Sequence, residues 1–172
     1  MEFQEFVHRA GNGEISIGIE PARARKFYCD YDPAKVYEAT GYDSRAESSL
    51  IRTVWIMEGV SLLAGIILSV VALRWYSLAA VPVMILMFLL LGGQASVGPV
   101  RLRGAVVLQL ASALVAFTLR RHGPFTVFFC LLLPTPFLFA KLTYWLAVNH
   151  LRRASVKNEK LYDMLLGTTL FI

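Results

Sequence analysis

The sequence predicts an all-α integral membrane protein, a four-span transmembrane helix bundle preceded by a small polar region. Two observations support this prediction. Of 172 residues, 56% are hydrophobic and only 17% are charged, whereas soluble domains average nearer a quarter charged. The acidic residues are also unevenly spread, because no Asp or Glu occurs between residues 59 and 158. A water-soluble domain would rarely lack acidic side chains over so long a stretch.

The polar N-terminal region, residues 1–49, is expected to hold one short helix and a possible short strand. The stretch EISIGIE alternates isoleucine with other residues, which is typical of a half-buried strand. The stretch YDPAKVYEATG predicts the helix. Asp32 suits the N-cap, Pro33 suits the first helical position, and Gly41 suits the exit.

The transmembrane bundle is expected over residues 50–148, because this part holds four apolar runs. A helix needs roughly 20 apolar residues to cross the hydrocarbon core. Pro134 and Pro136 interrupt the last run, and each removes a backbone donor whose carbonyl partner must then be satisfied by a neighbour. Such breaks occur both at transporter sites and as ordinary kinks. The predicted spans are residues 50–73, 76–92, 104–119 and 125–148.

The C-terminal tail, residues 149–172, is expected on the same side of the membrane as the N-terminus. Four spans return the chain to its starting side, and the bias of Lys and Arg toward that side predicts a cytoplasmic or equivalent location for both ends. The tail ends in the apolar stretch TTLFI, which would be an aggregation hazard if exposed. We expect it to pair with the EISIGI strand, the membrane surface or another subunit.

Glu58 is the acidic residue within the predicted spans, at a depth of ~12 Å if each residue rises ~1.5 Å. Lys141 lies ~10 Å deep in the fourth span by the same estimate, and Gln109 lies in the inner third of the third span. A lone charge there costs several kcal/mol, and pairing reduces that cost. We therefore predict that Glu58 faces Lys141. The pair would either fix the helix register or form a proton or cation site. A partner subunit could instead supply the counter-charge, or Lys141 could snorkel to the surface.

Two further sets of residues are candidate contacts. Small residues follow Glu58 along one stripe of the first span and predict a helix-packing face; they are Ser61, Gly65 and Ser69. Basic residues flank the spans, either as a solvated positive edge or as contacts to anionic lipid headgroups. The candidate headgroup contacts are Arg23, Arg25, Lys26, Arg152 and Arg153.

Catalytic and cofactor signatures are missing from the sequence. It has no nucleotide-binding loop, zinc-protease or serine-hydrolase motif. Cys29 and Cys130 form no paired motif, so neither a metal site nor a disulfide framework is predicted. The basic residues do not interleave with aromatics as they do in nucleic-acid-binding proteins. We predict no catalytic residue, no cofactor and no nucleic-acid partner, but membrane lipids and other membrane subunits as partners.

The sequence therefore favours a non-enzymatic accessory subunit of a larger membrane complex. A small transporter or channel with Glu58 as the proton or cation site is the first alternative. A membrane enzyme acting on a lipid or quinone is the second.

Overall fold

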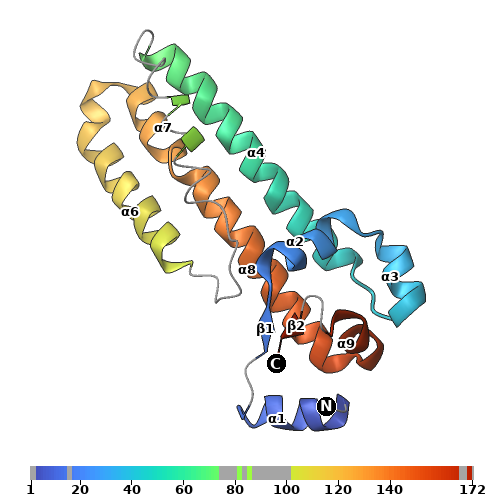
Figure 1. The fold of residues 1–172 in the computed structure, drawn as a ribbon. Coiled ribbons are helices and arrows are strands. Elements are labelled where there is room, and N and C mark those ends of the chain that lie inside the picture. Colours follow the sequence, from blue (N-terminus) through green and yellow to red (C-terminus); the bar gives the residue numbers. More distant parts are fainter. Residues whose placement is uncertain are drawn as a thin grey trace. The chain divides into compact units, whose positions relative to one another are not determined.

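The computed structural model describes residues 3–14, 17–73, 81–82, 85–86, 102–166 and 170–171. These residues form two compact units (Figure 1). We call the described residues up to Arg52 and from Thr143 the terminal unit, and those between Thr53 and Leu142 the helical unit. The elements are α1 (Phe3–Gly11), β1 (Gly18–Ile19), α2 (Pro21–Asp30), α3 (Pro33–Thr40), α4 (Arg45–Leu73), α6 (Arg103–Thr118), the 3-10 helix η2 (Leu119–His122), α7 (Pro124–Leu132), α8 (Thr135–Lys157), α9 (Glu159–Leu165) and β2 (Leu170–Phe171).

Helix α3 is the short helix that the sequence predicts, with the predicted ends. The Asp32 side chain accepts a hydrogen bond from the backbone N–H of Ala34 at 3.0 Å. Gly41 ends the helix with φ 73°, and its N–H donates to the Tyr37 carbonyl. This left-handed conformation favours glycine because glycine has no Cβ. Helices α1 and α2 are additional elements of the N-terminal region.

Strands β1 and β2 join the two ends of the chain. They pair antiparallel, with Gly18 opposite Phe171 and Ile19 opposite Leu170. The pairing confirms the predicted strand in EISIGIE, and it confirms the first of the three partners expected for the C-terminal stretch. Leu170 and Phe171 of the apolar end thus pair with a strand of the same molecule.

The core of the terminal unit combines side chains from both chain ends with the adjoining turns of α4 and α8. Phe6 from α1 and Tyr162 from α9 are buried, and their rings lie 4.5 Å apart between centroids. Ile51 of α4 and Leu151 of α8 are fully buried in the same cluster. The N-terminal region and the C-terminal tail are therefore one folded structure.

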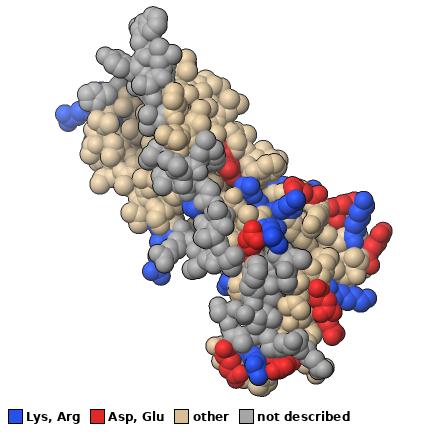
Figure 2. All heavy atoms as spheres, in the orientation of Figure 1, with Lys and Arg blue, Asp and Glu red and all other residues tan. Residues whose placement is uncertain are grey.

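Three helices of the described chain are long and apolar enough to cross a membrane: Arg45–Val71, Arg103–Arg121 and Thr126–Lys157. By length and composition, they identify a multi-pass membrane protein. They overlap the first, third and fourth predicted spans, and the last extends nine residues beyond its predicted end at residue 148. The second predicted span, residues 76–92, lies outside the described residues except for two short pieces. Figure 2 shows acidic and basic side chains gathered over the terminal unit, and few on the visible face of the long helices.

Within the helical unit, α6 packs beside η2 and α7. Gly123 follows η2 with φ 108°, and Pro124 then begins α7. The apolar run of the fourth predicted span is broken after Leu132 and resumes as α8 at Thr135. The break falls at Pro134, where the sequence predicts an interruption.

Candidate functional site

Three polar side chains of the helical unit meet at the break between α7 and α8. Pro134 has no N–H, so the carbonyl of Cys130, four residues earlier, has no donor within its own helix. Ser112 of α6 donates a hydrogen bond to that carbonyl. The prediction that neighbouring groups satisfy the carbonyls freed by proline is confirmed here.

The next carbonyl, that of Leu131, receives two side-chain hydrogen bonds. Gln109 of α6 donates through Nε2 at 3.1 Å, and Thr135 donates through its hydroxyl at 2.7 Å. Gln109 and Ser112 are three residues apart, so they lie on one face of α6. These contacts place the Gln109 side chain at the helix break. The sequence analysis did not predict the roles of Thr135 and Ser112. The sequence did hold a signal for Ser112, because Gln109 and Ser112 are two polar residues one turn apart in the span that precedes the proline-interrupted one.

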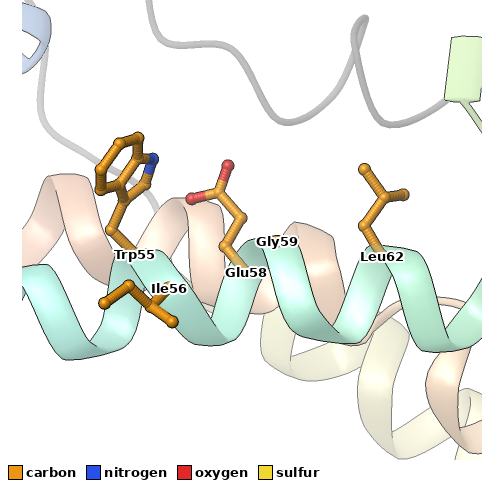
Figure 3. A pocket seen from close by; sticks show the side chains of 5 residues that line it. All are labelled: Trp55, Ile56, Glu58, Gly59 and Leu62. Carbon is orange, nitrogen blue, oxygen red and sulfur yellow. The ribbon is translucent and has the colours of Figure 1, made fainter.

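Glu58 lies on α4 and is only 9% exposed. Its side chain rises from the same side of the helix as those of Trp55 and Leu62, at i−3 and i+4 (Figure 3). These three residues, with Ile56 and Gly59, line a hollow of about 310 Å³. The carboxyl group thus stands in a largely apolar setting, where a charge is costly.

The stripe of small residues that follows Glu58 lies on the buried side of α4. Ser61 is 6% exposed, Ser69 is 1% exposed, and Gly65 is also buried. The two hydroxyls donate to carbonyls of their own helix, those of Glu58 and Gly65. Large apolar side chains elsewhere on this helix, such as Leu63, remain exposed. The stripe can therefore pack closely without leaving its own hydroxyls unsatisfied.

The prediction of a buried ion pair is wrong for the part of the chain that the structure describes. The ion pairs described there all involve solvent-accessible side chains of the N-terminal region, and none is buried. The Lys141 ammonium instead lies over the Phe137 ring, 5.6 Å from its centroid, a cation–π arrangement within α8. The rise per residue fixes the depth of a side chain but not its direction around the helix axis, so equal depth does not ensure that two charges form an ion pair.

The five candidate headgroup residues have different surroundings. Arg23 forms an ion pair with Glu20 at 2.8 Å. The Arg25 guanidinium stacks over the Tyr144 ring, 4.7 Å from its centroid. The remaining three side chains are exposed: Lys26, Arg152 and Arg153.

Tyr28 and Tyr42 form a polar contact within the terminal unit, with their hydroxyl oxygens 3.3 Å apart. Burial raises the pKa of the Tyr28 phenol well above its usual value, and the hydrogen bond with Tyr42 raises it further. Burial also raises the pKa of Tyr42. Both phenols are therefore neutral at physiological pH, and the contact is structural.

Metal-binding clusters of His, Cys, Asp or Glu are absent from the described residues. Comparison with models of known protein families, with curated proteins and with solved structures finds no match.

Proposed function

We propose that this chain is a four-span, non-enzymatic subunit of a larger membrane complex, with both termini on the cytoplasmic or equivalent side. The observation that carries the proposal is the helix break. Its side chains, Gln109, Ser112 and Thr135, are engaged in hydrogen bonds to backbone carbonyls. Carbonyls that are already bonded offer a substrate or ion little to bind, so the break serves to join α6 to α7 and α8.

The number of spans is supported by the terminal unit. The first turns of α4 and the last turns of α8 both belong to it, and we infer from this that the chain enters and leaves the membrane on one side. This requires an even number of crossings, whereas three candidate spans are described. The apolar run at residues 76–92, predicted from the sequence, is our choice for the fourth crossing. Most of the Lys and Arg residues of the chain lie in the terminal unit, which favours the cytoplasmic side for that unit.

The subunit role is supported by the apolar surface of α6. Large side chains at i, i+3, i+7 and i+10 form a continuous exposed stripe on this helix, and each is at least 61% exposed: Val107, Leu110, Leu114 and Phe117. This spacing is the one through which helices pack side by side. We propose this stripe as the contact with a neighbouring subunit.

The test is native mass spectrometry after gentle detergent extraction of the native protein. We expect different chains at a fixed stoichiometry, and a monomer or a pure homo-oligomer would overturn the proposal. The double variant Leu110→Ala/Leu114→Ala should weaken the complex. The matched control is Val60→Ala/Leu63→Ala, which removes similar apolar volume from exposed positions of α4. Equal weakening by both variants would exclude α6 as the specific contact.

A small transporter or channel is the second candidate, favoured by the burial of Glu58 beside the hollow at Trp55 and Leu62. In liposomes that hold the purified chain, a pH-dependent flux abolished by Glu58→Gln would support this function. The variant keeps the shape of the side chain and cannot ionise. Ser61→Ala, one turn further along the same stripe, is the control for a merely structural change.

A further inference from the structure

We propose that α2 lies in the headgroup layer of the membrane, where Arg25 and Lys26 bind the phosphate of an anionic phospholipid. The inference is independent of the subunit role, because it concerns a lipid site on the chain itself. Of the five basic residues that the sequence suggests as headgroup contacts, it assigns headgroup binding to Arg25 and Lys26 and not to the other three.

The position of α2 along the membrane normal is inferred from contacts at two points along the helix. Near its middle, Arg25 stacks on Tyr144 of α8. At its C-terminal end, Arg52 of α4 donates hydrogen bonds to the carbonyls of Tyr28, at 3.1 Å, and Tyr31, at 2.9 Å. Arg52 is the last charged residue before the apolar part of α4, and Tyr144 adjoins the exposed Trp145 near the end of the fourth predicted span. Aromatic and cationic side chains at such positions mark the membrane interface.

The orientation of α2 follows from its buried face. Four residues at i, i+3, i+6 and i+7 pack into the terminal unit: Pro21, Ala24, Phe27 and Tyr28. Lys26 lies on the exposed side, and Arg25 borders the buried face. The helix therefore keeps its apolar side in the protein and leaves these two cations at its surface.

The charge of Arg25 and Lys26 is available to a ligand. Neither side chain forms an ion pair with a carboxylate of the described residues, in contrast to Arg23, which Glu20 neutralises. The contact with the Tyr144 ring restrains the Arg25 guanidinium, and a guanidinium suits two-point binding of a phosphate through its N–H groups. Lys26 adds a second, mobile point charge.

The expected gain in affinity is about fivefold for each cation near an anionic surface, or roughly thirtyfold for the pair. Arg152 and Arg153 provide a matched comparison, because they carry the same charge on the same unit. They lie ~12 Å along α8 from Tyr144, estimated from the helical rise, in the direction away from the apolar run. We therefore expect them to contribute little to headgroup binding.

The test is lipid binding to the purified full chain in detergent, with native mass spectrometry to count retained lipids. Phosphatidylglycerol is the anionic probe and phosphatidylcholine the neutral one. The wild-type chain should prefer phosphatidylglycerol, and Arg25→Gln/Lys26→Gln should lose this preference by about thirtyfold. Arg152→Gln/Arg153→Gln should retain it.

Three outcomes would overturn the proposal. The wild-type chain could show no preference for phosphatidylglycerol, the two double variants could lose it equally, or an excess of inorganic phosphate could displace the lipid. The last would identify a site for free phosphate instead of a headgroup. The single variant Lys26→Gln tests the proposal without risk of misfolding, because it changes an exposed side chain. Its preference for phosphatidylglycerol should fall by about fivefold.

Discussion

Asn158 offers a sharp test of how the two chain ends hold together. Its side-chain oxygen accepts a hydrogen bond from the N–H of Leu161 at 2.9 Å and so caps α9. Its Nδ2 donates to the carbonyl of Thr40 at 3.0 Å, at the end of α3 and 118 residues away in sequence. Asn158→Ala removes both bonds. The lost cap costs about 1 kcal/mol, and the lost bond to the Thr40 carbonyl costs about 1 kcal/mol more.

A loss of about 2 kcal/mol corresponds to roughly thirtyfold in an equilibrium constant. Hydrogen exchange of the α9 amides in the detergent-solubilised chain measures it, because exchange there reports opening of the tail. Asn158→Ser is the matched control, since serine still caps the helix but cannot reach as a second donor in the same geometry. It should open about fivefold more readily than wild type. Unchanged exchange in Asn158→Ala would refute the reasoning, and equal exchange in the two variants would assign the whole effect to the Thr40 bond.

Two further predictions concern the tyrosine pair and the helix break. Because burial, and then the hydrogen bond with Tyr42, raises the pKa of Tyr28, its contribution to stability is present below the ordinary tyrosine pKa of about 10 and is lost above it. Tyr28→Phe should therefore reduce the alkaline loss of stability, measured by hydrogen exchange on either side of that pH, and an unchanged pH slope would contradict this. At the break, Ser112→Ala should cost about 0.6 kcal/mol in detergent unfolding. Pro134→Ala should suppress that cost by restoring a backbone donor to Cys130, and strictly additive effects of the two changes would exclude the coupling.

Much of the local structure could be predicted because local signals determine it. Asp32, Pro33 and Gly41 define α3 through caps that act over a few residues. The break at Pro134 follows from a missing N–H, whatever surrounds it. The pairing of the chain ends could also be predicted, because an apolar, β-favouring terminus needs a backbone partner and the alternating isoleucines offer one.

Other features depend on tertiary context and gave no clear local signal. Helix α2 reads as a charged segment, and only its packing on Tyr144 and Arg52 reveals one buried side. The prediction of a buried ion pair between Glu58 and Lys141 is wrong for a related reason. Depth along a helix can be counted from the sequence, but the direction of a side chain depends on how each helix is rotated in the bundle. Lys141 lies over Phe137, a neighbour on its own helix.

The two intramembrane features therefore lead to different functional expectations. A cation entering the helix break would have to displace the side-chain hydrogen bonds that Gln109 and Ser112 make to the carbonyls, so the break favours a fixed structure over an ion path. Glu58 keeps its carboxyl in a largely apolar setting beside a hollow. Under the transporter hypothesis, this carboxyl is the group that would bind a proton or cation. Glu58→Gln separates the two functions, because a packing role tolerates the amide whereas proton or cation binding does not. Intact assembly without flux in both proteins would support the subunit, and loss of a wild-type flux would support the transporter.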